Sequence, residues 1–201
     1  MYEHLASFLG GPPNEYHLRL YSEWAKHDWG MIITGNVQIS KNHLSLARDM
    51  ILPFPISANA TKEEESVQAF RQLSDAIHGV YSVSGCPDET KRNKTLAIMQ
   101  LNHTGRQAAN FLGGKLPLRN PPLAPSAIRV GSGTHASFGS RVLNALIFQV
   151  PKEMSESDVE STMEAFVQGA VLAHRAGFDG VQLHAAHGCE FFVLPHVLYF
   201  S

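Results

Sequence analysis

Short apolar runs alternate with amphipathic helical segments along the chain, and this alternation constrains the fold more than any other feature. Residues 31–34 (MIIT) lie between Gly30 and Gly35, and residues 95–101 (TLAIMQL) form a second apolar run. Continuous apolar runs of this length are typical of strands buried on both faces, as in a parallel sheet. A further strand is expected within residues 178–186, FDGVQLHAA.

Helix signals separate these runs. Thr61 and Ser155 each begin a capping-box pattern with an acidic residue three positions later, and Gly79 and Gly177 are expected to end the two helices. An earlier segment, residues 17–28, also has helical spacing. The apolar residues expected to face the core in these three helices are Leu18, Tyr21 and Trp24; Val67, Phe70, Leu73 and Ile77; and Val159, Met163, Phe166 and Ala170.

Strands that alternate with helices predict right-handed βαβ units and a parallel sheet. Both an open doubly wound sheet and a (β/α)₈ barrel fit this pattern. Polar residues follow the predicted strands at Thr34–Asn36, Gln100–His103 and His184–His187, at the carboxyl ends where both architectures place their chemistry. Residues 113–139, rich in proline and glycine, are predicted to form a long surface excursion that builds part of a site.

The composition narrows the class of partner. The chain has 201 residues, 44% of them hydrophobic and 17% charged, with a formal net charge of -2. Because the sequence has no block of lysines and arginines, we expect no positively charged surface that would bind nucleic acid or an anionic membrane. The two cysteines match no disulfide framework, and the N-terminal residues have no signal-peptide pattern, so we expect a cytoplasmic protein. Its expected partner is a small molecule or another protein.

Three side chains are candidates for chemistry. His184 and His187 could both donate to one carbonyl or phenolate oxygen, but their spacing also fits two metal ligands, as in a metal-dependent barrel lyase, or ordinary structural histidines. Gln100 carries donors and an acceptor on one planar group. Such a carboxamide suits the alternating edge of a pyrimidine or flavin ring, although a glutamine at a strand end is more often a loop tie.

The tracts GMIITGN, QLNHTGRQ and GFDGVQLHAAHG occur in this order and at this spacing in one family. The chain resembles the N-terminal half of the Old Yellow Enzyme family, the FMN-dependent NAD(P)H:flavin oxidoreductases and ene-reductases. The resemblance covers residues 1–188. It implies an α/β fold with parallel strands, namely a partial TIM (β/α)₈ barrel of about the first four βα units, in a single domain over residues 1–201 with a divergent tail at 189–201.

The resemblance also implies roles for individual residues. Gln100 would bond the pyrimidine edge of FMN, Gly35 and Asn36 would lie beside the isoalloxazine, and Tyr2 or Glu3 would fall at the end of the first strand. His184 and His187 would hold the carbonyl oxygen of an α,β-unsaturated substrate over the flavin. NADH or NADPH would reduce FMN, which then gives hydride to the β-carbon, and the motif residues His103, Arg106 and Gln107 are expected to organise loops.

Two departures from the family pattern affect this expectation. Cys189 stands where the family has the tyrosine that protonates the substrate, and a thiol does not reach as far, so proton delivery would fall to water or fail. A complete barrel needs roughly 250 residues. The chain is therefore expected to be a truncated relative, and the truncation is either genuine or an artefact of the gene model. Its partial barrel would be closed by another copy in a homo-oligomer or by a complementing half-barrel. The alternative is an inactive remnant that acts as an interaction protein.

Overall fold

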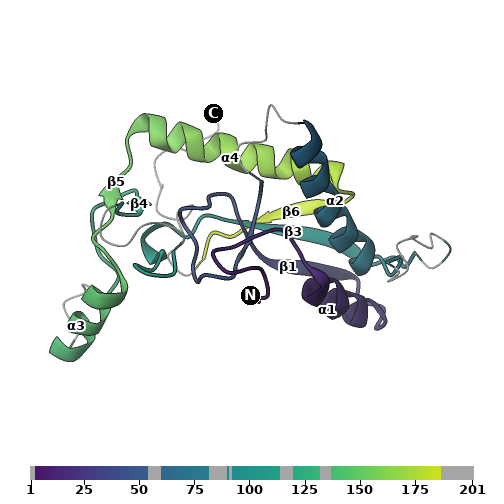
Figure 1. Cartoon of the computed structure of the whole chain (residues 1–201), viewed down its shortest axis with the longest axis horizontal. Helices are drawn as coiled ribbons and strands as arrows, with labels where there is room; N and C mark the ends of the chain where they lie inside the picture. Colours follow the sequence, from purple (N-terminus) through teal and green to yellow (C-terminus); the bar gives the residue numbers. More distant parts are fainter. Residues whose placement is uncertain are drawn as a thin grey trace.

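The structure, a computed structural model, describes residues 3–53, 60–81, 90, 92–113, 120–131 and 137–186. Its centre is a four-stranded sheet in the order β2-β1-β3-β6, in which all paired strands are parallel (Figure 1). The strands are β1 (Met31–Gln38), β2 (Met50–Ile51), β3 (Leu96–Asn102) and β6 (Gly180–Leu183). The three predicted strands are thus confirmed as β1, β3 and β6, and β1 runs four residues beyond the predicted apolar run.

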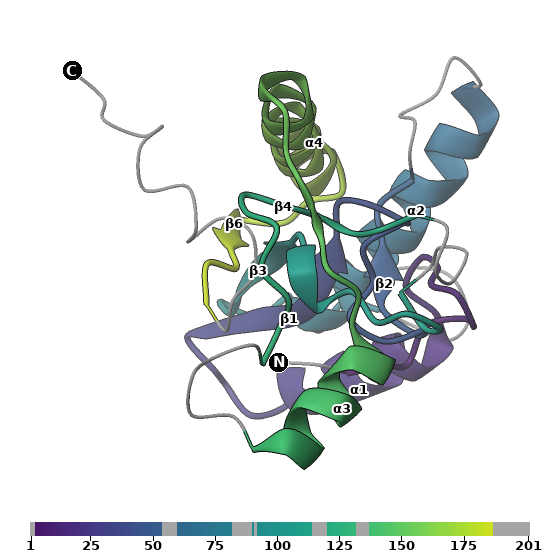
Figure 2. The same ribbon diagram turned by 90° about the vertical axis from the view of Figure 1, so that its left-hand side faces the viewer.

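Three helices cover the sheet. They are α1 (Glu15–Ala25), α2 (Ala60–Ile77) and α4 (Glu156–Arg175), and Figure 2 shows them following one another around one side of the strands. Their apolar faces meet in one core, in which Tyr21 of α1, Phe70 of α2 and Phe166 of α4 are all buried. The helix layer therefore lies on a single face of the sheet.

The alternation along β3 shows which face the helices cover. Ala97, Met99 and Leu101 are completely buried in the core beneath the helices. Leu96, which points to the opposite face, is 44% exposed. A doubly wound sheet would have helices on both faces, whereas consecutive strands with every helix on one side are the arrangement of a barrel.

The helix boundaries confirm most of the sequence signals. Ser155 caps α4, because its hydroxyl accepts from the Asp158 amide (3.2 Å) and the Asp158 carboxylate accepts from the Ser155 amide (2.9 Å). Gly177 follows with φ of +82°. Two expectations were wrong: α2 begins at Ala60, so Thr61 lies inside the helix, and Met163 is 43% exposed because the buried face of α4 is rotated toward its C-terminal half. The buried residues of α4 are Phe166, Gly169, Leu172 and Ala173.

The excursion after β3 contains structure that the sequence did not predict. It includes a short 3₁₀ helix η2 (Gly105–Gln107), a parallel strand pair of β4 (Leu123–Ala124) and β5 (Lys152–Glu153), and helix α3 (Phe138–Ile147). Helix α3 projects away from the sheet (Figure 1), and its side chains are all exposed or half-buried. Within the described ranges, no helix combines the length and apolar character needed to cross a bilayer.

The shared core predicts a large effect of truncating Phe70, which is completely buried at the centre of the helix layer. We expect Phe70→Ala to lower the free energy of unfolding by about 3–5 kcal/mol, since it removes buried apolar area and leaves a cavity. Met163→Ala, on the exposed side of α4, is the control and should change this free energy by less than about 0.5 kcal/mol. Urea denaturation followed by circular dichroism measures both, and equal effects would contradict this assignment of the core.

Candidate functional site

A row of three carboxamides crosses the sheet on the face without helices. The strand register places Asn36 of β1 opposite Gln100 of β3, and Gln100 opposite Gln182 of β6. Gln100 Nε2 donates to Gln182 Oε1 (2.5 Å), so the side chains from β3 and β6 are tied together. Gln182 was not among the predicted site residues. The signal for it was present, because Gln-Leu occurs near the end of both β3 and β6 and therefore marks equivalent positions.

A second polar layer lies nearer the carboxyl ends of the strands. Asn102 Nδ2 donates to Gln38 Oε1 (3.2 Å), and Gln38 Nε2 donates to Asp49 Oδ2 (3.0 Å). Asp49 also accepts from the amide and the hydroxyl of Ser45, at 2.6 and 2.7 Å. Because Gln38 and Asn102 are completely buried, these bonds satisfy polar groups that would otherwise destabilise the sheet. This layer supports the carboxamide row.

His184 lies at the same edge of the sheet. Its amide donates to the Leu101 carbonyl (2.9 Å), which continues the ladder one residue beyond β6, and its side chain is buried. It therefore lies two residues beyond Gln182, close to the carboxamide row. His187, Cys189 and Tyr2 lie outside the described residues. Within the part of the chain that the structure describes, no three His, Cys, Asp or Glu side chains are grouped as metal ligands.

An irregularity in β1 sets the direction of Asn36. Ile33 pairs with Ile98 and Asn36 pairs with Gln100, so β1 has one more residue than β3 in this interval and forms a bulge at Thr34–Gly35. The Thr34 hydroxyl replaces the missing ladder acceptor: it accepts from the Gln100 amide (3.0 Å) and donates to the Gly35 carbonyl (2.8 Å). A single hydroxyl thus joins the bulge to the strand that carries Gln100.

The Gly35 amide points away from β3 toward the Glu3 carboxylate. It donates to Glu3 Oε1 (2.9 Å) and to the Tyr21 hydroxyl oxygen (2.8 Å), and Tyr21 in turn donates to the same carboxylate oxygen. A Cβ on Gly35 would lie 2.7 Å from the Glu3 carboxyl carbon, so only glycine leaves room for this carboxylate. Both backbone groups of Gly35 are therefore engaged within the protein. The position of Gly35 beside the flavin stays a prediction.

The environment of Glu3 changes its acidity. Burial raises the pKa of the Glu3 carboxyl to about 7, in opposition to the hydrogen bond from Gly35, which lowers this pKa. His17 Nε2 lies 3.8 Å from Glu3 Oε2, but burial lowers the pKa of His17 to about 4, so this ring is neutral at physiological pH. Glu3 is therefore a buried acid that titrates near neutral pH, and the neutral His17 ring provides no positive charge beside it.

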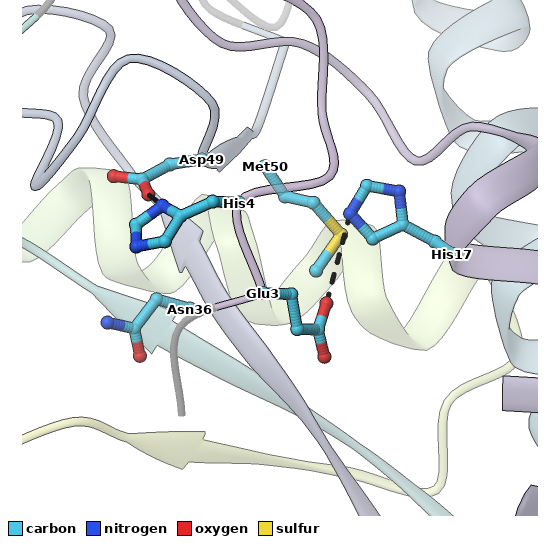
Figure 3. A pocket seen from close by; sticks show the side chains of 6 residues that line it. All are labelled: Glu3, His4, His17, Asn36, Asp49 and Met50. Atoms are coloured by element: carbon cyan, nitrogen blue, oxygen red, sulfur yellow. Dashed lines mark ion pairs between the residues drawn. The ribbon is translucent and has the colours of Figure 1, made fainter. Parts of the chain in front are cut away.

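A small cavity adjoins this cluster. Figure 3 shows the side chains around it, with Glu3 directed toward His17 while His4 turns toward Asp49, whose carboxylate lies 3.1 Å from His4 Nδ1. Its volume of about 10 Å³ accommodates roughly one water molecule. Asn36 also lines it, and both carboxamide atoms of Asn36 are buried without a hydrogen-bond partner among the described residues. A buried carboxamide of this kind requires a water or a ligand.

The histidine and arginine of the motif after β3 hold neighbouring loops. The His103 ring packs against the His43 ring in a tilted arrangement, with a centroid separation of 4.3 Å and an interplanar angle of 37°, and His43 Nε2 accepts from the Leu123 amide (3.0 Å). Arg106 donates to the Ile128 carbonyl (3.3 Å) and to the Ser126 hydroxyl (3.2 Å). These contacts tie the excursion to the strand ends, in agreement with the predicted loop-organising role.

Comparison with known proteins identifies the family. The family described as NADH:flavin oxidoreductase / NADH oxidase has a sequence model that matches residues 10–196. The chain belongs to this family. Membership implies an FMN cofactor with NADH or NADPH as the reductant, and it confirms the resemblance found in the sequence. Among its relatives, an NADH-dependent flavin oxidoreductase of Neonectria sp. is 36% identical over 178 residues, and another of Hypocrea jecorina is 32% identical over 184 residues.

The chain corresponds to a part of these oxidoreductases. The two alignments cover 88% and 90% of the chain but 20% and 40% of the relatives. Among solved structures, the old yellow enzyme homologue from Zymomonas mobilis matches with a TM-score of 0.66 and 23% identity, over 94% of this chain and 44% of that chain. Morphinone reductase matches with a TM-score of 0.62 and 20% identity, over 92% and 43%. These structures confirm the predicted fold, a partial (β/α)₈ barrel.

The position of the Thr34 hydroxyl predicts a specific cost for its removal. Thr34→Val keeps the shape of the side chain but leaves the buried Gln100 amide without its acceptor, which should lower the free energy of unfolding by about 1–3 kcal/mol. Thr34→Ser retains the hydroxyl and should cost less than Thr34→Val. Denaturant titration of the two variants makes the comparison, and a smaller loss for valine than for serine would show that the hydroxyl does not support the ladder.

Proposed function

We propose that the chain forms the cofactor-binding and substrate-binding half of an FMN-dependent oxidoreductase that reduces α,β-unsaturated carbonyl compounds with NADH or NADPH. The observation that carries this proposal is the carboxamide row of Asn36, Gln100 and Gln182 on the uncovered face of the sheet, at the strand ends beside His184. When bound, FMN accepts hydride from the nicotinamide and supplies it to the β-carbon of the substrate.

The residues present fit FMN. The pyrimidine edge of an isoalloxazine alternates donors and acceptors, and carboxamides carry both on one planar group. Asn36 supports this match because its buried carboxamide has no hydrogen-bond partner among the described residues, although its side chain is only 5% exposed. Gln182 holds one N–H of Gln100, which fixes the plane and orientation of that carboxamide. Gln100 and Asn36 would therefore bond the ring edge, Gly35 would set the direction of Asn36, and Tyr2, which lies outside the described residues, would also contact the ring.

His184 and His187 would bind the substrate. Two imidazole N–H groups directed at one carbonyl oxygen stabilise the negative charge that grows on this oxygen as hydride reaches the β-carbon. The buried position of His184 favours this role, because a donor shielded from water stabilises such a charge more strongly. Cys189 lies in the sequence where the family places a proton-donating tyrosine, and its shorter side chain leaves protonation of the α-carbon to water.

The open edge of the sheet is a surface to which another polypeptide would bind. In the described part of the chain, β6 pairs with β3 alone, and Val181 and Leu183 are 38% and 40% exposed. Exposed strand edges and apolar surface of this kind favour association with another polypeptide. A second copy of the chain or a complementing half-barrel would close the site around the flavin.

Binding of FMN tests the role of Gln100. We expect the purified chain to bind FMN with quenching of flavin fluorescence, and Gln100→Leu to weaken this binding by about 5- to 150-fold, which corresponds to about 1–3 kcal/mol for the lost hydrogen bonds. Gln68→Leu, on the exposed surface of α2, is the matched control and should bind like the parent chain. Absence of FMN binding at any concentration would instead favour the alternative of an interaction protein.

Steady-state kinetics test the role of His184. With NADH and 2-cyclohexen-1-one, His184→Ala should lower kcat by about 10²- to 10³-fold, as removal of an oxyanion donor does in other enzymes. FMN affinity should stay within about twofold of the parent value, because His184 is assigned to the substrate and not to the pyrimidine edge. An unchanged kcat together with weakened FMN binding would show that His184 contacts the cofactor and not the substrate.

A further inference from the structure

Glu3 is a buried acid that contacts the backbone of the proposed flavin site. Its side chain is 5% exposed and comes from a segment 32 residues before Gly35 in the sequence. His4, the next residue, has φ of +46°, a left-handed conformation that is uncommon outside glycine. This turn separates the two neighbouring side chains, so that Glu3 is directed toward α1 and His4 toward Asp49 (Figure 3).

The carboxylate holds the extra residue of the bulge. Gly35 has no ladder partner on β3 for its amide, and Glu3 Oε1 and the Tyr21 hydroxyl supply the acceptors. A carboxylate is the stronger of these acceptors, because hydrogen bonds to an ionised group are about twice as strong as those between neutral groups. The direction of the next residue, Asn36, depends on how the bulge is held.

Asn36 supplies a second, independent observation that points to a ligand. Both atoms of its carboxamide are buried and lack a hydrogen-bond partner among the described residues, and it lines the same cavity as Glu3. The hydrogen bond that the Gly35 amide donates to Glu3 and the single peptide link from Gly35 to Asn36 form a short connection between the acid and this carboxamide. Movement of the Gly35 amide would therefore move a side chain of the flavin site.

We propose that Glu3 is a positioning residue whose carboxylate, through the Gly35 amide, fixes the Asn36 carboxamide for cofactor binding and releases it on protonation. This inference rests on the proposed function for the identity of the ligand. Protonation weakens the bonds that Glu3 Oε1 accepts, which loosens the bulge. The ionised form of Glu3 therefore corresponds to the form that binds FMN more tightly.

The groups around Glu3 allow this titration near neutral pH. From α1, Tyr21 donates to the carboxylate, and His17 Nε2 lies 3.8 Å from Glu3 Oε2. His17 Nδ1 contacts both the amide (3.2 Å) and the side-chain Oδ1 (3.0 Å) of Asn14, the N-cap of α1. Across the cavity lie His4 and Asp49, which interact with each other. Burial is the dominant effect on Glu3 and raises its pKa to about 7, so both protonation states are populated between pH 6 and 8.

Nuclear magnetic resonance of the flavin-free chain tests the connection directly. The Gly35 amide and the Asn36 side-chain NH₂ resonances should titrate together with a midpoint near pH 7, and this titration should be absent in Glu3→Gln, which keeps an acceptor oxygen but cannot ionise. Glu23→Gln, which neutralises an exposed glutamate on the same helix layer, should titrate like the parent chain. An Asn36 resonance that does not move, or that moves equally in Glu3→Gln, would overturn the proposal whether or not FMN binds.

Binding of FMN to the same proteins gives the functional consequence. The parent chain should bind FMN about two- to fivefold more tightly at pH 8 than at pH 6, which corresponds to a shift of about half to one pKa unit in Glu3 on binding. Glu3→Gln should show a flat profile. FMN binding of the parent chain without pH dependence, or the same pH dependence in Glu3→Gln, overturns the positioning role. If the chain does not bind FMN at any pH but the Gly35 and Asn36 resonances still titrate together, only the proposed function is contradicted.

Discussion

The bulge at Thr34–Gly35 is the constraint on which the site depends. Ile32 and Val37 both face the helix layer, yet they are five residues apart, and a regular strand would place them on opposite faces. One extra residue corrects this alternation. As a consequence, Asn36 and Gln38 turn to the uncovered face, where they meet Gln100 and Asn102. The burial of Val37 in the core and the polarity of the site are thus two results of the same irregularity.

Two groups outside the sheet's regular ladder maintain this irregularity. Thr34 contributes its hydroxyl on the side of β3, and Glu3 contributes its carboxylate on the side of α1. The first group ties the bulge to Gln100 and the second ties it to the helix layer through Tyr21. The geometry of the carboxamide row is consequently set by the core and by the N-terminal segment, although the row itself lies on the opposite face of the sheet.

The sequence predicted those parts of the molecule whose physical signals are local. The long apolar runs gave β1 and β3, the Ser155 capping box gave the start of α4, and the polar residues at strand ends gave Gln100 and Asn36. Gln182 was missed because its position opposite Gln100 depends on the register between two strands. The role of Glu3 was also beyond local patterns, since the bond to Gly35 joins residues 32 positions apart. Helix α3 was not predicted, and its apolar side chains are exposed in the structure.

The role proposed for the uncovered face of this sheet is to bind the ring edge of FMN through Gln100 and Asn36. A crystal structure of the chain grown with FMN would show whether it does. We expect the pyrimidine edge of the isoalloxazine to lie within hydrogen-bonding distance of both carboxamides, on the side of the sheet opposite α1, α2 and α4. A flavin bound elsewhere, or both carboxamides bonded to water or protein in a flavin-loaded crystal, would contradict it.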